Sequence, residues 1–600
     1  MSLLSPEELT LLHTDNKYKA YVSSIEKCLK NFESSSEWAD LISSLGKLKK
    51  VIHSSPKYHY IPKRVNVCKR LAQCLHPALP SGVHLKALEV YTCIFQNIGA
   101  ENLAKDLFLY SSGLFPLLAN AALSVKPVLL NLYESYFLPL KKSLRPGLTG
   151  LLIAVLPGLE EGSDFYQRTF NLIKNICLAQ SDSGASVTNI NNYIADDKYF
   201  HSCIWSAIIS ESYIRFAAIQ FMLSNYELKK RSGGPVNAND QLYLIGNSID
   251  LMISAICCCL QDANSLVQRS ILDLICTCLP MSTKNVTRSD KVQLVTVAIH
   301  VVLRRDMTLN RRIYSWLMGN GSSSEESKKN DKKYFEAHSK SILIQSIKTL
   351  LNKKEASSIL YLLNDEMPVV ASQAGTVSHT GQSAQISPGA ATTLKLIKII
   401  SNLVERQDIG QAIIDDILLD LLFYVYKEYS FLNLNNGPVS SNVQSYLSIK
   451  KGTSNFQHVQ QQQQQSQNLK DSNELKKAAC NFLFHSFQIF FIWDFCASKF
   501  EHICKNFTSS NRLESASSHT ITSESVHSST LNPAQLCDLY EFILELLANS
   551  DMYNEIQTEH LPVMLKRIIQ TITNYCEKMT NQDLSKSFLL CLKILNKIKY

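Results

Sequence analysis

Glycine (20) and proline (17) are about half as frequent in this 600-residue chain as in average proteins, where the pair reaches roughly 12%. This scarcity of chain breakers excludes an all-β sandwich, a collagen-like repeat and a mainly disordered chain, and it favours long helices. The 60 lysines and arginines against 52 acidic residues give a net charge of +8, which is too small for a surface that coats nucleic acid along its whole length.

Apolar residues recur with helical spacing through the first 318 residues, and no strand-like alternation of useful length is present. Each group of apolar residues steps by three or four and therefore lies on one face of a predicted helix. The first two groups are Ile61, Val65, Cys68, Ala72 and Leu75, then Leu85, Leu88, Tyr91, Phe95 and Ile98. Later groups are Ile271, Leu274, Ile275 and Cys278, then Leu294, Ala298, Val301 and Val302.

Short breakers separate these segments and leave two helical architectures open. A set of separate bundles and an α-solenoid of stacked helix pairs both consist of short helices joined by brief turns. No change of composition divides residues 10–180 into bundles. Pro80, Pro116 and Pro157 lie 36 and 41 residues apart, close to the roughly 40-residue period of HEAT and armadillo repeats. We therefore predict an all-α fold, an α-solenoid of HEAT/armadillo-like helical repeats with disordered inserts.

The composition changes after Gly319 and divides the chain into regions. Residues 1–318 form the predicted helical-repeat domain. Residues 319–338 are predicted as a linker, because the segment NGSSSEESKKNDKK (320–333) contains no apolar residue. Three regions follow: a helical region at 339–446, a Gln-rich low-complexity linker at 447–474 and a second helical region at 475–600.

Four segments lack the apolar area that would offset the entropy of ordering the chain, so we predict that they are mobile. They are 320–333, the Ser/Gly/Ala/Thr-rich 371–393, the Gln-rich 452–475 and the Ser/Thr-rich 507–532. The last helical pattern reaches Tyr600 without a Gly or Asn cap. We therefore expect the chain to be the front part of a longer protein.

The cysteine spacing is that of neither a disulfide framework nor a zinc site. The 17 cysteines include the run Cys257–Cys259 and the pair Cys276 and Cys278, but no C-x-x-C pair and no histidine pair at ligand spacing. Most lie in apolar helical stretches, where a thiol behaves as a small hydrophobic group. We therefore expect a reducing compartment.

Neither a targeting segment nor a catalytic motif is recognisable. The N-terminus has no basic segment followed by an apolar one, as a secretory signal would. The apolar run at 242–260 carries Asn247 and Asp250 near its middle, which favours a buried core helix over a membrane span.

Glycine-rich phosphate loops, H-E-x-x-H, G-x-S-x-G and EF-hand loops do not occur. We expect a soluble, non-enzymatic protein with no catalytic residue, metal or cofactor.

The densest charge feature is a basic stretch at 41–70 that contains no acidic residue, with Tyr58 and Tyr60 in its Pro-flanked turn. One interpretation is a surface for an anionic membrane, where each basic residue contributes about 1 kcal/mol. A solvated helix face is another, and nucleic acid a third, although no RNA-binding or helix-turn-helix motif accompanies the stretch. The candidate membrane- and phosphoinositide-binding residues are Lys47, Lys49, Lys50, Lys57, Lys63, Arg64, Lys69 and Arg70.

A second cluster of charges lies where one apolar helix is predicted to end and another to begin. Arginines at a helix C-terminus meet the negative end of its dipole, and Asp306 can cap the next helix. The alternative is a corner that docks a partner or an anion, because the arginine fork suits carboxylate and phosphate. The partner-docking candidates are Arg304, Arg305, Arg311, Arg312 and Trp316.

Several long strings of this sequence resemble the N-terminal region of the Dopey family. The resemblance covers residues 10 to about 320 and, more faintly, the helices at 393–433 and 475–500. The Gln-rich and Ser/Thr-rich inserts have no counterpart in the family. The strings are LPSGVHLKALEVY (79–91), DLFLYSSGLFPLL (106–118), SVKPVLLNLYESYFLPL (124–140), LLIAVLPGLEEGSDFYQRT (151–169) and LRRDMTLNRRIYSWLMG (303–319).

The resemblance implies a large cytosolic protein, peripheral on Golgi (trans-Golgi network) and endosome membranes, that acts in traffic between these compartments. It implies a Mon2-like scaffold as partner, links to a phospholipid flippase and to kinesin light chain, and phosphoinositide binding, such as phosphatidylinositol 4-phosphate, by the N-terminal region. The family has no established catalytic motif. Self-association stays open, as do two other functions: a nucleic-acid-binding helical-repeat protein and an exchange or regulatory factor of a small GTPase.

Overall fold

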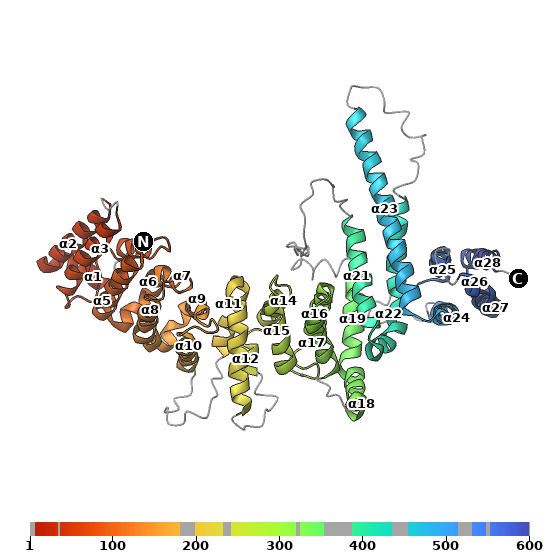
Figure 1. The fold of residues 1–600 in the computed structure, drawn as a ribbon, viewed down its shortest axis with the longest axis horizontal. Helices are drawn as coiled ribbons and strands as arrows, with labels where there is room; N and C mark the ends of the chain where they lie inside the picture. The colour runs from red at the N-terminus through yellow and green to blue at the C-terminus, as the bar shows by residue number, and fades with distance from the viewer. Residues whose placement is uncertain are drawn as a thin grey trace. The chain divides into compact units, whose positions relative to one another are not determined.

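The computed structural model describes residues 6–33, 37–180, 198–231, 242–319, 325–352, 387–434, 454–513, 531–547 and 553–598. These residues form helices and no strand, and helices that are close in sequence pack together within two compact units (Figure 1). One unit comprises Met1–Val297 and Arg311–Asn320, and the other comprises Ala298–Asn310 and Gly321–Tyr600. The predicted all-α helical-repeat fold is confirmed.

The first unit consists of short helices joined by brief turns, with one π-turn, η1, and several 3-10 turns among the described residues. The elements up to residue 158 are α1 (Pro6–Thr14), α2 (Asn16–Glu33), α3 (Trp38–His53), α4 (Arg64–Cys74), α5 (Ser81–Lys105), α6 (Leu107–Leu114), α7 (Leu117–Asn120), α8 (Lys126–Leu132), η1 (Tyr133–Phe137), η2 (Leu138–Gly147), α9 (Leu148–Val155) and η3 (Leu156–Gly158). Those that follow are α10 (Tyr166–Gln180), α11 (Lys198–Ser210), η4 (Ser212–Ile214), α12 (Arg215–Arg231), α13 (Leu242–Ile245), α14 (Ile249–Leu260), α15 (Ser265–Cys278) and α16 (Arg288–His300), and α17 (Met307–Met318) follows η6 of the second unit.

The core of the first unit follows the predicted helical faces for most of its length. In α5, Leu88, Tyr91, Phe95 and Ile98 are buried as predicted, and α5 packs against α3. The Phe95 ring contacts several aromatic rings of neighbouring elements, among them the Tyr110 ring at a centroid distance of 5.5 Å. Such edge-to-face contacts add to the free energy gained by burying apolar area. The buried face of α5 therefore joins α3 on one side and α6 on the other.

The predicted face is confirmed at Ile61, Cys68 and Leu75, which are buried, but not at Val65. Val65 is exposed, whereas Val67 and Leu71, which the predicted spacing left out, are fully buried. The spacing assumed a helix that already included Ile61, but α4 begins at Arg64, after Lys63 in the left-handed conformation (φ 52°). Because this turn precedes α4, Val65 does not continue the face that begins at Ile61, and the buried residues of α4 are Val67, Cys68, Leu71 and Cys74.

The second unit contains longer helices. Its elements up to residue 434 are η6 (Val301–Arg304), α18 (Glu325–Tyr334), the π-turn η7 (Phe335–Ser339), α19 (Lys340–Leu351), α21 (Pro388–Val404) and α22 (Gln407–Leu434). Those that follow are α23 (Ser454–Ser486), α24 (Ile489–Leu513), α25 (Pro533–Leu547), α26 (Tyr553–Glu555), the π-turn η9 (Ile556–His560), α27 (Leu561–Tyr575), η10 (Cys576–Lys578) and α28 (Asn581–Leu595).

The predicted linker at 319–338 is corrected for most of its length, because α18 and η7 occupy residues 325–338 of it. Glu and Lys are good helix formers, so a segment without apolar residues can extend a helix that is anchored elsewhere. The anchor is the next turn of the same helix, where Phe335 is fully buried. Composition alone therefore misjudged this segment.

The Gln-rich segment is corrected in the same way. Residues 454–474, predicted as a mobile linker, form the first part of the 33-residue helix α23. Leu475 is buried with Ala390 of α21 and Leu432 of α22. The buried Asp471 carboxylate accepts a hydrogen bond from the Ser387 amide at 2.8 Å. Contacts with α21 and α22 therefore hold α23 around Asp471 and Leu475.

Two other predicted inserts are shorter than expected. Residues 388–393 belong to α21, and residues 507–513 belong to α24. The rest of the insert at 371–393, apart from Ser387, and residues 514–530 of the insert at 507–532 lie outside the described residues, as do residues 320–324 and 447–453.

The apolar run at 242–260 forms α13 and α14, and α14 is a core helix as predicted, with Met252, Ile256 and Cys259 fully buried. None of the helices in the described ranges combines the length and the apolar character needed to cross a bilayer.

Candidate functional site

The basic stretch at 41–70 forms α3, the turn after it and α4, and long-range ion pairs neutralise half of its candidate residues. Lys49 Nζ lies 3.0 Å from Glu89 Oε2, Lys57 Nζ lies 3.5 Å from Asp15 Oδ2, and Lys63 Nζ lies 3.1 Å from Glu26 Oε1. Arg64 pairs with two further carboxylates. Every acidic partner lies outside 41–70, on an element that the fold brings to the basic helices.

Arg64 is the most enclosed of the four ion-paired candidates, with 13% of its side chain exposed, and is a structural cation. Its Nη1 donates to Glu8 Oε2 at 2.7 Å, and its Nε lies 3.1 Å from Asp106 Oδ2. Glu8 is only 2% exposed and also accepts the Tyr18 hydroxyl at 3.1 Å. Burial by itself would lower the pKa of Arg64. The Asp106 and Glu8 carboxylates favour the charged guanidinium more strongly, so the pKa of Arg64 is raised. Arg64 is therefore removed from the candidate membrane-binding residues.

Tyr58 also belongs to the core. Its ring stacks on the Tyr21 ring at a centroid distance of 5.7 Å and meets the Tyr18 ring edge-on at 5.0 Å. Its hydroxyl donates to Asp15 Oδ2 at 2.8 Å, and this hydrogen bond lowers the pKa of Asp15 to about 2. A buried ring cannot insert into a bilayer interface, so the membrane interpretation loses one of its two tyrosines, and Tyr60 is half-buried.

Three of the predicted residues are exposed and also lack an ion pair within the described part of the chain. Lys47 and Lys50 on α3 and Lys69 on α4 are exposed, and none of them forms an ion pair with any residue that the structure describes. Arg70 is half-buried and donates to Gln73 Oε1 at 3.1 Å. The candidate membrane-binding residues that remain exposed and unpaired among the described residues are therefore Lys47, Lys50 and Lys69.

Two lysines that the sequence prediction left out lie on the neighbouring helix. Lys27 and Lys30 of α2 are exposed, and α2 packs against α3. Burial raises the pKa of the Cys28 thiol on α2, and the positive charge of Lys47 opposes this rise. Lys47 therefore lies close to Cys28, on the side of α3 that faces α2. The interspersed Glu26 and Glu33 hid these lysines, since a search for runs without acidic residues passes over α2.

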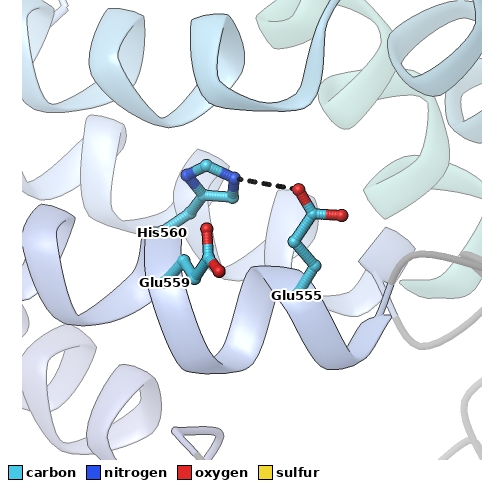
Figure 2. A group of neighbouring side chains, drawn as sticks. All are labelled: Glu555, Glu559 and His560. Atoms are coloured by element: carbon cyan, nitrogen blue, oxygen red, sulfur yellow. Dashed lines mark ion pairs between the residues drawn. The ribbon is translucent and has the colours of Figure 1, made fainter.

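The described residues also contain one group of side chains that could hold a metal ion. Glu555, Glu559 and His560 place one ligand atom each within 4.8 Å of one another (Figure 2). All three belong to α26 and η9, where the wider π-turn brings His560 to the side of Glu555. His560 Nε2 lies 3.9 Å from Glu555 Oε1, and both carboxylates are exposed. This contact accounts for the arrangement without a metal.

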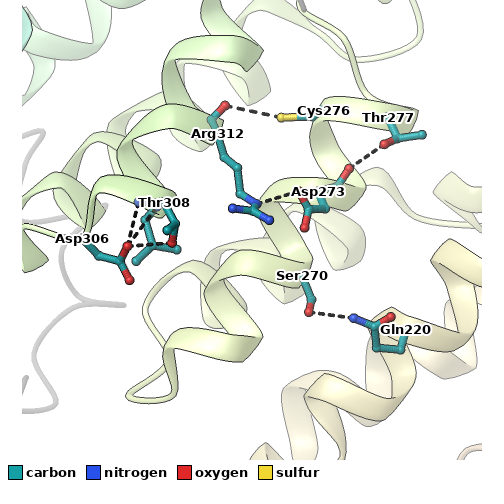
Figure 3. A network of polar contacts seen from close by, with 9 residues as sticks. Gln220, Ser270, Asp273, Cys276, Thr277, Asp306, Thr308 and Arg312 are labelled. Carbon is teal, nitrogen blue, oxygen red and sulfur yellow. Dashed lines mark hydrogen bonds and ion pairs between the residues drawn. The ribbon is translucent and has the colours of Figure 1, made fainter.

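The second predicted cluster is mainly structural. The Asp306 carboxylate accepts the Thr308 amide at 2.8 Å and the Thr308 hydroxyl at 2.6 Å, and so caps α17 as expected. Figure 3 shows Arg312 reaching from α17 to Asp273 of α15, with Nε 2.7 Å from Oδ1. Trp316 is 3% exposed and donates its indole N–H to the Leu279 carbonyl at 2.8 Å.

The partner-docking prediction is therefore wrong for Trp316, which is a core residue, and Arg312 is held by Asp273. Arg304 is half-buried, whereas Arg305 and Arg311 are exposed. The sequence could not separate these roles, because a tryptophan after an arginine cluster suits a core helix and a docking corner equally well.

Arg305 adopts the left-handed conformation (φ 56°) where η6 ends. We expect Arg305→Gly to raise the free energy of unfolding by about 0.5–1 kcal/mol, because the left-handed strain it removes exceeds the added entropy of glycine. Arg311→Gly is the matched control, since this exposed arginine lies inside α17 and its replacement should lower stability by about 1 kcal/mol. Thermal unfolding of both variants measures the two changes in stability. A gain in both variants or a loss in both would contradict the left-handed strain at Arg305.

Comparison with known proteins assigns the family. The family model described as "Dopey, N-terminal" matches residues 15–322. Mouse protein DOP1B is 34% identical over 614 residues, covering 99% of this chain and 24% of the relative. The Drosophila melanogaster DOP1 homolog is 33% identical over 604 residues (98% and 20%), and Saccharomyces cerevisiae DOP1 is 30% identical over 392 residues (57% and 23%).

The chain thus spans about a quarter or less of the length of these curated relatives. No solved structure matches it. The family match covers the helices that carry both charge clusters, including α2 to α4 and α17, and it agrees with the resemblance of the long strings between residues 79 and 319. The chain belongs to the Dopey family and contains its N-terminal region.

Proposed function

We propose that this chain is part of a non-enzymatic helical scaffold for membrane traffic between the Golgi and endosomes. It is cytosolic and peripherally bound to trans-Golgi network and endosome membranes, with a Mon2-like scaffold protein as partner. Membership of the Dopey family is the observation that carries the proposal. The stacked helices support it, because such arrays present extended surfaces on which several partners bind at once.

The membrane-facing surface in this proposal consists of the exposed lysines of α2, α3 and α4. Each lysine close to an anionic leaflet contributes about 1 kcal/mol, and the attraction falls off within a Debye length. Lys47, Lys50 and Lys69 are suited to this role because their charges are not offset by ion pairs within the described residues. A phosphoinositide headgroup such as phosphatidylinositol 4-phosphate supplies several negative charges at one point of the membrane.

Co-sedimentation with liposomes tests this surface in the full 600-residue chain. We expect binding to phosphatidylcholine vesicles that contain phosphatidylinositol 4-phosphate and weaker binding at higher salt. The triple variant Lys47→Glu, Lys50→Glu and Lys69→Glu should bind at least 100-fold more weakly, because three attractions of about 1 kcal/mol each become repulsions. All three side chains are exposed, so the fold should be unaffected.

A matched control separates this surface from general electrostatics. Lys395, Lys398 and Lys477 of the second unit are exposed, and changing them to Glu alters the net charge by the same amount. This control should sediment like the parent chain. An equal loss of vesicle binding in both triple variants would contradict the proposal that these lysines bind the membrane. Failure of the parent chain to sediment with the vesicles would contradict it as well. Salt-sensitive RNA binding without lipid binding would point to the nucleic-acid alternative instead.

A further inference from the structure

The first turn of α21 meets carboxylates from two neighbouring helices. The amide of Ser387, the N-cap residue of α21, donates to Asp471 Oδ2 of α23 at 2.8 Å. Glu428 of α22 lies over Gly389, where an added Cβ would overlap the Glu428 Oε1 atom. Asp471 is 1% exposed and Glu428 is 5% exposed. The amide groups and the positive end of the helix dipole stabilise carboxylates at this position, so these two charges tie α22 and α23 to α21.

Beside these polar contacts, α23 meets its neighbours through a small apolar cluster. Ala390 of α21, Leu432 of α22 and Leu475 of α23 are buried together, and Leu394 packs against them. Parts of a protein that bury little apolar area open at a lower free-energy cost than its main core does. The docking of α23 near residues 471–475 therefore depends on its polar contacts and responds to a change of charge beside them.

Ser387 is placed to carry such a change. It precedes Pro388, and proline-directed protein kinases phosphorylate serines that are followed by proline. Its side chain makes no capping hydrogen bond, and its Oγ is enclosed without a hydrogen-bond partner among the described residues. The hydroxyl thus adds no hydrogen bond to the docked arrangement, while the amide of the same residue holds the Asp471 carboxylate.

We propose that Ser387 is a phosphorylation site whose modification releases α23 from α21 and α22. The co-reactant is ATP, bound by a proline-directed kinase. The Ser387 Oγ forms a bond to the γ-phosphorus, the bond from this phosphorus to the ADP oxygen breaks, and the hydroxyl proton passes to a basic group of the kinase. Because the Oγ is enclosed, the first turn of α21 opens before the hydroxyl reacts, and the phosphate then prevents it from closing.

The surrounding charges decide the direction of the effect. A phosphoserine carries a charge of about −1.5 to −2 at pH 7 and stabilises many helix N-termini, but it is disruptive beside Asp or Glu. The N-terminus of α21 is already occupied by Asp471 and Glu428, which are buried and therefore repel another anion more strongly than in water. The lysines next to them in sequence, Lys427 and Lys470, are exposed, so water and salt weaken their attraction. Repulsion therefore prevails.

Phosphorylation of the full 600-residue chain tests the site. The chain is incubated with ATP and a mitogen-activated protein kinase, and the modified peptides are mapped by mass spectrometry. We expect phosphate on Ser387. Leu475→Ala, which loosens α23, should raise the rate of modification at least fivefold, because the hydroxyl becomes accessible more often. Leu71→Ala is the matched control, since Leu71 is equally buried but belongs to α4 of the first unit, and it should leave this rate unchanged.

Hydrogen exchange separates the charge of the modification from its size. Ser387→Asp should speed the exchange of amides at 468–480 at least tenfold. Ser387→Asn is the matched control, because asparagine has the same size and is an equally good N-cap residue but carries no charge. Its exchange should equal that of the parent chain. Adding Asp471→Asn to Ser387→Asp should recover part of the protection, because one of the two repelling carboxylates becomes neutral.

Each result decides for or against the switch. Faster exchange in Ser387→Asp and in the phosphorylated chain, but not in Ser387→Asn, would support it. The same exchange in the Asp and Asn variants, slower exchange after phosphorylation, or no phosphate on Ser387 even in Leu475→Ala would overturn it. None of these measurements involves lipid or the lysines of α2 to α4, so the membrane-binding proposal stands or fails separately.

Discussion

Replacement of Arg64 by alanine is expected to destabilise the N-terminal helices more than replacement of any other basic residue in the stretch. The variant leaves Glu8, which is 2% exposed, and Asp106 without their cation. Removing one partner of a buried ion pair typically costs about 3–5 kcal/mol, because the other charge stays buried and uncompensated. Thermal unfolding of the full chain measures the change. Lys69→Ala, on the same helix but exposed, should alter stability by no more than about 0.5 kcal/mol.

The effect of Arg64→Ala should depend on pH in a defined direction. Burial raises the pKa of Asp106 in the folded protein, and Arg64 counteracts part of this rise. Without Arg64 the folded-state pKa rises further above the unfolded value, so the folded variant binds a proton more readily than the unfolded chain. Stability then falls as pH rises through that pKa. The loss of stability of Arg64→Ala relative to the parent chain should therefore be smaller at pH 5 than at pH 8. A larger loss at pH 5 would contradict the proposed role of Arg64 beside Asp106.

The ion pairs of Arg64 also show why the basic stretch could be found from the sequence but not interpreted. The absence of acidic residues from 41–70 is a local property, whereas Glu8, Glu26, Glu89 and Asp106 approach it only through packing. No spacing rule links Arg64 to a carboxylate 56 residues earlier. Sequence patterns thus located the basic stretch, and the fold determines which of its charges are paired with carboxylates.

Helical periodicity predicted the fold class because it depends on neighbouring residues, and it misplaced a single position, Val65, just after the turn that precedes α4. Composition, by contrast, predicted mobility for residues that form the first part of the helix α23. Its glutamines have adequate helix propensity, and burial of Leu475 and Asp471 against α21 and α22 supplies the stabilisation that the composition lacks. Rules that assign mobility from low apolar content overlook helices that are held at one end only.

Gly113→Ala is expected to lower the free energy of unfolding by about 2 kcal/mol, because it overpacks the crossing of α6 and α4. A Cβ at this position would lie 2.7 Å from the Ala72 Cα and 2.8 Å from its Cβ. The gain in helix propensity, about 1 kcal/mol in an exposed helix, is outweighed because the helix axes must move apart. Thermal unfolding of the full chain measures the loss, together with the change in buried apolar area inferred from denaturant slopes.

Two further substitutions make this prediction specific. Gly46→Ala, in the middle of α3, places its Cβ 3.9 Å from Lys86 Cε, and Gly82→Ala in the first turn of α5 places it 3.8 Å from Ile42 Cδ1. Both are ordinary contacts, so these variants should gain about 0.4–1 kcal/mol from the lower entropy of the unfolded chain. Adding Ala72→Gly to Gly113→Ala should restore stability only in part, since the closest atom to the new methyl group is the Ala72 Cα, which glycine retains. Full restoration would show that the side chains, rather than the backbones, limit the approach of α4 and α6.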